Sequence, residues 1–183
     1  MLSYLLRRSR RKTIALEITP EGTLLVRAPL HMPEKAIRTF VEKHENWAAA
    51  RLPGVRARAA VWAQITPEIE SALRKAAEHD LLPRAAHWAA VMQLHPSGLR
   101  ITGAQKRFGS CSGRGTLCFS WRLMLYPQAA RDYVVVHELA HLVHFNHSPD
   151  FYALVQRYLP DYKKCQSLLR AAPDLPDFLQ NKS

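Results

Sequence analysis

The sequence predicts an α+β protein. Two segments, 12–30 and 99–125, place alternating apolar and polar residues on both sides of a turn rich in small residues, which is typical of paired β-strands. Between and after them, apolar residues recur every three or four positions, which is typical of helices that pack on one face. No apolar run approaches the length of a membrane span, so we expect a cytoplasmic protein with no membrane partner.

The first expected part, residues 1–65, contains a β-hairpin, a helix and a basic segment. The hairpin lies within 12–30, where a turn with Pro and Gly separates two alternating stretches. The helix covers 33–52, because it begins with Pro and carries one apolar stripe. A Pro-Gly pair at 53–54 is expected to end it, and the Arg/Ala-rich stretch 55–64 is expected to be a linker.

The second expected part, residues 66–172, begins with helices. Thr66 is a typical N-cap because Pro follows it at the first helical position and acidic residues follow in the first turn. This helix is expected to break near Pro83, and a further helix then reaches Met92. Strands at 99–102 and 116–125 are expected to form a second hairpin and an antiparallel sheet across a Gly/Ser-rich loop.

The C-terminal third is expected to be helical. Pro127 opens a helix that carries the candidate site. Two further helices are expected at 150–158 and 161–171, because Pro160 interrupts the apolar pattern between them. Residues 173–183 are expected to form a flexible tail.

His137, Glu138 and His141 form the pattern H-E-x-x-H within an apolar helical stretch. Residues four apart on a helix share a face, so both imidazoles can bind one Zn²⁺ ion. The intervening glutamate is then placed to act as a general base toward water at the metal. An apolar helix would bury these polar side chains at a cost unless they had a metal or other partners, which favours a metal site over ordinary core histidines.

A catalytic zinc site needs a third protein ligand, and two histidines follow the motif closely. His144 lies seven residues after His137, which places it about 10.5 Å further along a helix, too far to share the ion. Asn146 is a plausible helix end, and Ser148 reads as the cap of a new helix, so the chain should turn between them. That turn can return His147 to the metal, and we predict His147 as the third ligand.

The positive charge is concentrated in the first part of the chain. Residues 1–114 carry 19 Lys and Arg against 9 Asp and Glu, whereas 115–183 carry 7 against 6. A basic N-terminal part is compatible with nucleic acid or a nucleotide as a partner, and equally with a solvated basic surface. The three cysteines lack C-x-x-C spacing, so neither a disulfide framework nor a structural zinc site is indicated.

Several motifs together resemble the YgjP-like family of zinc metallopeptidases, which is related to the WLM and SprT-type peptidases. They are the sequences RFGSCS at 107–112, FSWRL at 119–123, YVVVHELAH at 133–141, NHSPDF at 146–151 and PDYK at 160–163. The resemblance is specific from about 97 to 170, and the opening RRSRRKTIAL also resembles the first strand of that family. Phe108 replaces the usual Trp of the family's R-W-G-S-C stretch, and the region 53–65 looks shortened.

The resemblance implies a gluzincin-like, minimal zincin-like domain with an antiparallel sheet packed on the HExxH helix. It also implies one Zn²⁺ per chain, held by His137, His141 and His147, with Glu138 as the catalytic base. The implied activity is hydrolysis of a peptide or protein substrate. Residues 116–122 are a candidate strand for pairing with an extended peptide.

Two other functions remain open from the sequence. Some family members are catalogued as nucleoside triphosphate pyrophosphatases, which is a metal-dependent alternative. A DNA-associated, SprT-like protease or nucleic-acid-binding module is the other, and it rests on the basic N-terminal part.

Overall fold

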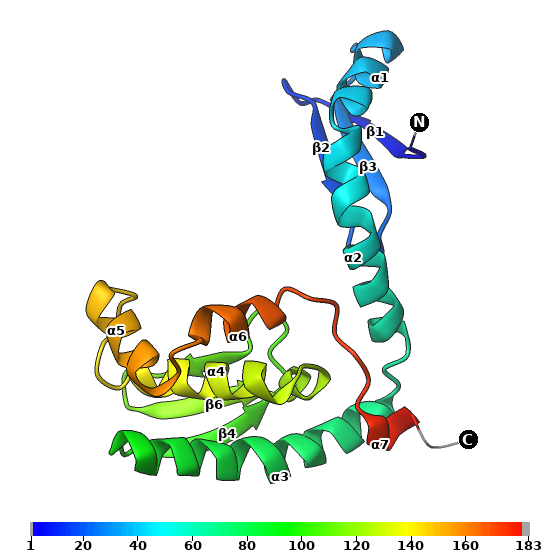
Figure 1. The fold of residues 1–183 in the computed structure, drawn as a ribbon. Helices are drawn as coiled ribbons and strands as arrows, with labels where there is room; N and C mark the ends of the chain where they lie inside the picture. The colour runs from blue at the N-terminus through cyan, green and yellow to red at the C-terminus, as the bar shows by residue number, and fades with distance from the viewer. Residues whose placement is uncertain (1, 181–183) are drawn as a thin grey trace. The chain divides into compact units, whose positions relative to one another are not determined.

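The computed structural model describes residues 2–180 (Figure 1). Met1 lies outside the described residues, and so do residues 181–183. Met1 is the first residue of the expected basic part, and 181–183 are the last residues of the expected tail. The chain divides into two compact units, one reaching Gln64 and the other starting at Ile65. Among the described helices, none combines the length and the apolar character that crossing a bilayer requires.

The first unit contains a three-stranded sheet with the order β1-β3-β2. Its strands are β1 (Leu5–Ser9), β2 (Ala15–Ile18) and β3 (Leu24–Pro29). β2 and β3 are antiparallel across a turn in which Gly22 has φ +80°, whereas β1 runs parallel to β3 on its other side. Alternate residues of β3 are buried against the helices of the unit, which explains the period-two pattern in the sequence.

Helices α1 (Glu34–Lys43) and α2 (Glu45–Ala63) complete the first unit, and the second of them corrects the sequence analysis. The helical path is interrupted at His44 instead of at 53–54, and the stretch expected to be a linker is helical. Leu52 and Ala48 are buried with Leu24 of β3, and the continued helix lets Arg56 Nε donate to the Gly22 carbonyl at 3.1 Å. These contacts offset the free-energy cost of Pro53, which removes one backbone hydrogen bond from α2.

The second unit contains another three-stranded sheet, with the order β4-β6-β5. Its strands are β4 (Gly98–Thr102), β5 (Gly109–Cys111) and β6 (Thr116–Ser120). The expected purely antiparallel sheet is wrong: β5 pairs antiparallel with β6, but β4 pairs parallel with it. The tight turn is only 112–115, where Gly115 has φ +79°, so the hairpin joins β5 to β6 and leaves β4 for the opposite edge.

Helix α3 (Pro67–Met92) is continuous through Pro83, where the sequence analysis expected a break. An interior proline costs about 3 kcal/mol. Six residues of α3 are buried along one stripe, and each large apolar side chain contributes about 1.5–3 kcal/mol, which outweighs that cost. They are Leu73, Ala77, Leu81, Ala85, Ala89 and Met92.

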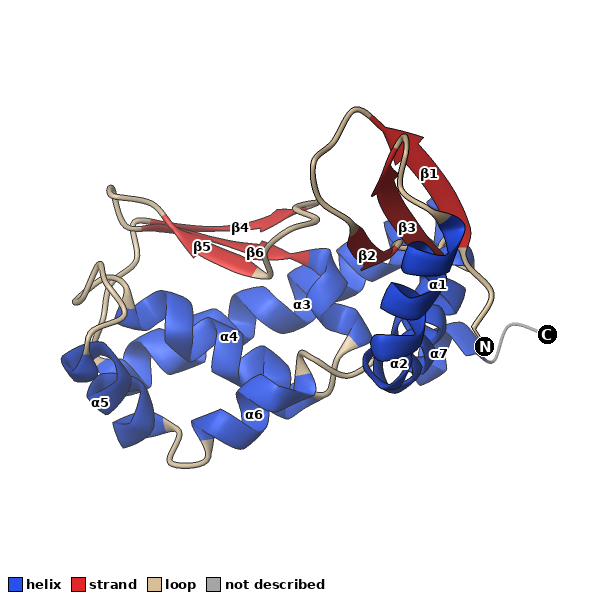
Figure 2. Cartoon of the chain, turned by 90° about the horizontal axis from the view of Figure 1, so that it is seen from above, coloured by secondary structure: helices blue, strands red, loops and turns tan. Residues whose placement is uncertain are grey.

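The remaining elements of the second unit are helical. They are η1 (Trp121–Leu125), α4 (Gln128–Ala140), α5 (Pro149–Tyr158), α6 (Tyr162–Leu168) and α7 (Asp177–Gln180). η1 is a 3₁₀ turn in the stretch expected to extend the strand, because Ser120 Oγ accepts from Arg122 N–H and turns the chain. Figure 2 shows the sheet along one side of α3 and α4, and α4 also packs against α5 and α6. α4 is therefore the buried central helix of the unit.

A network of ion pairs fastens α4 to α3. The Arg84 guanidinium donates to Asp80 Oδ1 at 2.6 Å and to Asp132 Oδ1 at 2.7 Å. Trp88 Nε1 also donates to Asp132, at 2.9 Å, and Arg131 pairs with Asp80 at 3.1 Å. All four charged side chains are at most 23% exposed. Hydrogen bonds are stronger where water is largely excluded, so the network fixes the position of α4 against α3.

Candidate metal centre

The candidate site is built at the C-terminal end of α4 and in the turn that follows. His137 and Glu138 lie in the last turn of α4, and His141 is its C-cap residue. Helix α5 begins anew after Ser148, whose Oγ accepts from Phe151 N–H at 3.3 Å. The chain between the two helices reverses, and this reversal brings His147 back to the end of α4.

The structure brings the three predicted ligands together. One ring nitrogen from each of His137, His141 and His147 lies within 4.8 Å of the others. The Nε2 atoms of His137 and His147 are 3.1 Å apart. Two nitrogens held at about 2.0–2.1 Å by one tetrahedral ion are about 3.3 Å apart, so this separation suits a shared ion.

The His137 and His141 rings both have a hydrogen-bond partner on their far side, and for His141 this partner sets the tautomer. His141 Nδ1 lies 3.0 Å from the backbone carbonyl of His144, which can only accept, so Nδ1 carries the proton and Nε2 keeps its lone pair. His137 Nδ1 lies 3.3 Å from Tyr133 Oη, on the side of the ring away from His147. His144, which the sequence analysis excluded as a ligand, therefore contributes its carbonyl and not its ring.

The electrostatic environment favours the neutral form of the His137 and His141 rings, which is the form that binds metals. Burial and the neighbouring histidines lower the pKa of His137 to about 4. Burial also lowers the pKa of His141, with a further contribution from His147. At neutral pH these two rings therefore offer lone pairs without first losing protons.

Glu138 lies beside the histidines and is 7% exposed. Burial raises the pKa of its carboxyl to about 7, although the positive charge of Arg107 acts in the opposite direction. Strand β5 passes so close that a Cβ atom on Gly109 would lie 2.5 Å from Glu138 Cγ. Only glycine therefore lets β5 cover this carboxylate.

These residues line a cleft of about 370 Å³. Its other walls come from Arg107, Ser110 and Cys111 around β5 and from Phe145 in the turn after α4. The sequence analysis did not assign these residues to the site, although the Gly/Ser-rich loop around them was a usable signal. It proposed 116–122 as the peptide-pairing strand, but β6 is central in the sheet, and β5 is the edge strand that borders the cleft.

The residues present fit a zinc ion. They offer three imidazoles with converging nitrogens, and imidazole is a ligand that zinc favours. A cation there would also favour the ionised form of the buried Glu138 carboxylate. Among residues 2–180, no second group of histidine, cysteine or acidic side chains has comparable geometry.

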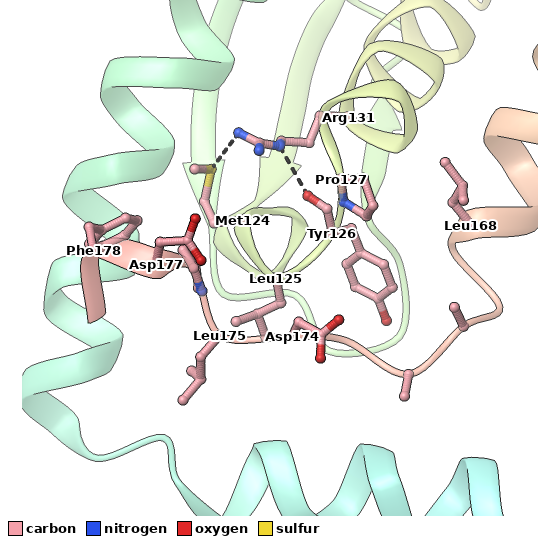
Figure 3. A pocket seen from close by; sticks show the side chains of 13 residues that line it. Met124, Leu125, Tyr126, Pro127, Arg131, Leu168, Asp174, Leu175, Asp177 and Phe178 are labelled. Carbon is pink, nitrogen blue, oxygen red and sulfur yellow. Dashed lines mark hydrogen bonds between the residues drawn. The ribbon is translucent and has the colours of Figure 1, made fainter. Parts of the chain in front are cut away.

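A separate pocket of about 480 Å³ lies between η1, the start of α4 and the C-terminal segment 168–178 (Figure 3). Arg131 reaches over it, with Nε donating to the Tyr126 carbonyl at 3.1 Å. The backbone N–H of Asp174 donates to the Leu125 carbonyl at 3.0 Å, within the stretch expected to be a tail. The pocket contains none of the predicted site residues.

The α+β fold and a three-histidine cluster beside a buried carboxylate define the class of metal-dependent hydrolase sites. The model of one family, described as the YgjP-like metallopeptidase domain, matches residues 62–172. This match covers more than half of the chain, and the protein belongs to the YgjP-like family.

Two other comparisons add less. A solved structure similar to part of the chain is that of the metallopeptidase zymogen of Pyrococcus abyssi abylysin. The two are 20% identical with a TM-score of 0.45, over 49% of this chain and 90% of the other. No curated protein matches the chain by sequence.

Proposed function

We propose that this protein is a zinc-dependent metallopeptidase, with one zinc ion per chain held by His137, His141 and His147. The observation that carries the proposal is the convergence of three imidazole nitrogens beside the buried Glu138 carboxylate. A zinc ion in such a site supplies an activated water and polarises a carbonyl oxygen. Membership of a metallopeptidase family supports the same reaction class.

The protein's own groups divide the remaining work. Glu138 accepts a proton from the attacking water and is placed to pass it to the leaving amine, which is general acid–base catalysis. Tyr133 and the His144 carbonyl hold two of the histidine rings in the orientation that points Nε2 into the cleft. The free edge of β5 offers backbone groups to an extended peptide, which would bind as an added strand.

The test compares wild type with Glu138→Gln, both loaded with zinc, on fluorescently labelled casein. We expect the variant to keep its zinc and its fold and to lose about 10²–10⁴-fold in turnover, because only the proton acceptor is removed. Casein hydrolysis that is equal in both proteins would reject Glu138 as the base and would point to a contaminating protease.

The two alternatives have less support. Phosphate hydrolysis usually relies on Mg²⁺ held by carboxylates, and Glu138 is the only acidic side chain among the described residues that line this cleft. Residues 1–64 carry 12 Lys and Arg against 5 Asp and Glu, which is the one feature that favours a nucleic-acid partner. Binding to a short DNA duplex that weakens steeply with salt would support that partner, and no binding at low salt would exclude it.

A further inference from the structure

Arg107 is a charged side chain in the cleft to which the reaction described above gives no role. It is exposed and lines the cleft together with Glu138 and His147. It forms no hydrogen bond or ion pair with the part of the chain that the structure describes, and its charge acts on Glu138 from a distance. A guanidinium in this state is free to bind a ligand.

The loop that carries Arg107 is anchored on both sides. Before it, Ser120 Oγ donates to the Ala104 carbonyl at 2.8 Å, and Arg122 Nη1 donates to the Gly103 carbonyl at 2.6 Å. After it, the backbone N–H of Ser120 donates to the Phe108 carbonyl at 2.7 Å. The anchors fix the backbone on either side of Arg107, so its side chain starts from a defined point at the cleft wall.

The Phe108 ring adds a further anchor. It meets the buried Tyr126 ring edge to face, with centroids 4.9 Å apart. The departure from the family's usual Trp at this position therefore leaves an aromatic contact in place. Arg107 is thus presented by a loop whose neighbouring side chain, the half-buried Phe108, packs against a buried aromatic ring.

The charges in the cleft favour an anion. Apart from the histidine cluster, Arg107 is the only cationic side chain and Glu138 the only acidic one among the described residues that line it. With a divalent cation bound, the cleft carries a net positive charge. A substrate group that bears a negative charge is therefore attracted to it, and the planar guanidinium matches a carboxylate through two parallel hydrogen bonds.

We propose that Arg107 is a specificity-determining residue that binds a carboxylate of the peptide substrate close to the scissile bond. This inference rests on the proposed peptidase function. The carboxylate comes either from an Asp or Glu side chain or from a free peptide C-terminus, and both would pair with the guanidinium in the same way. Peptides with an acid at the position that reaches Arg107 are then preferred over their amide counterparts.

The experiment uses binding, so that it does not depend on turnover. Labelled peptides are titrated by fluorescence anisotropy against zinc-loaded Glu138→Gln protein. One set moves a single Glu, or its Gln counterpart, through each position of an otherwise neutral, C-terminally amidated peptide. A second set carries no acidic side chain and compares a free with an amidated C-terminus.

The same titrations are repeated with Arg107→Gln and Arg107→Lys in the same background. Arg114→Gln is the matched control, because Arg114 is exposed in the neighbouring turn and does not line the cleft. We expect one Glu position, or the free C-terminus, to bind about tenfold more tightly than its neutral counterpart. Arg107→Gln should abolish the difference, Arg107→Lys should keep part of it, and Arg114→Gln should keep all of it.

Equal binding of acidic and neutral peptides, a preference that survives Arg107→Gln, or no binding of any peptide would overturn the inference. Tighter binding of a nucleoside triphosphate than of every acidic peptide, lost in Arg107→Gln, would also overturn it, because the anion would then be a phosphate. Cleavage of the neutral peptides by zinc-loaded wild type is measured separately. If zinc-loaded wild type does not cleave these peptides, the proposed peptidase function is rejected, and the binding result can still be interpreted.

Discussion

Tyr133 Oη lies 3.3 Å from His137 Nδ1, one helical turn earlier on α4. The two rings are inclined at 54°, and the Tyr133 ring stacks on that of Tyr162 from α6. Burial raises the pKa of the Tyr133 hydroxyl to about 12, so it remains protonated at neutral pH. A histidine that binds metal through Nε2 carries its proton on Nδ1, and Tyr133 is the acceptor for that proton.

We therefore expect Tyr133→Phe to weaken zinc binding by about 10- to 100-fold, the usual cost of removing such an orienting partner. Competition with a chromophoric chelator measures the affinity. Tyr158→Phe is the control, because Tyr158 lies at the far end of α5 and does not line the cleft. Equal zinc affinity in wild type and Tyr133→Phe would show that the aromatic contacts hold the His137 ring without the Tyr133 hydroxyl.

The two histidines of the turn after α4 should differ sharply in their effect on metal content. His147→Ala removes a converging nitrogen, so we expect a clear loss from about one zinc per chain. His144→Ala should retain the metal, because His141 contacts the backbone carbonyl of that residue and not its ring. Elemental analysis of both variants, purified without added metal, measures this, and equal zinc in the two would reject the assignment.

Gly109→Ala tests the approach of β5 to the Glu138 carboxylate, the proposed base. The added Cβ would lie 2.5 Å from Glu138 Cγ, so either the strand or the side chain must move. A displacement of about 1 Å can lower turnover about 10²-fold, and we expect that loss with zinc content unchanged. Gly113→Ala should behave as wild type, since no atom lies within 4 Å of its added Cβ. Full activity in Gly109→Ala would mean that Glu138 tolerates a shift.

The ion pairs between α3 and α4 predict how stability depends on pH. Burial raises the pKa of Asp80, but the hydrogen bonds and charges of Arg84 and Arg131 outweigh it and leave the pKa below its ordinary value of 3.8. A carboxyl with a lowered pKa stabilises the fold above the unfolded-state pKa and loses that contribution as the pH falls through the folded-state value.

Asp80→Asn should accordingly reduce the free energy of unfolding by about 1–3 kcal/mol at pH 7. The difference between variant and wild type should shrink once the pH falls below about 4, because the wild-type carboxyl is then also becoming protonated. Urea unfolding at both pH values measures it. If the two proteins differed equally in free energy of unfolding at pH 7 and pH 3, the shape of the Asp80 side chain and not its charge would be responsible.

The proline positions show where local sequence signals fail. Proline predicts an interruption at 53–54 and again near 83, yet α2 and α3 run through both. The penalty for proline is local and can be read from the sequence, whereas the compensating burial comes from strands and helices distant in the chain. The interruption between α1 and α2, at His44, has no strong sequence signal, and there His44 Nδ1 lies 2.7 Å from the Phe40 carbonyl.

The sequence by itself determined the parts of the site that depend on helical periodicity. The four-residue spacing of His137 and His141 places both rings on one face, and the Ser-Pro start of α5 requires a turn before it. Only the tertiary structure decided which strand borders the cleft, that β5 comes close enough to require Gly109, and that Arg107 lines the cleft with the three histidines. Strand order and close approach depend on the packing of segments far apart in the sequence, which residue spacing cannot encode.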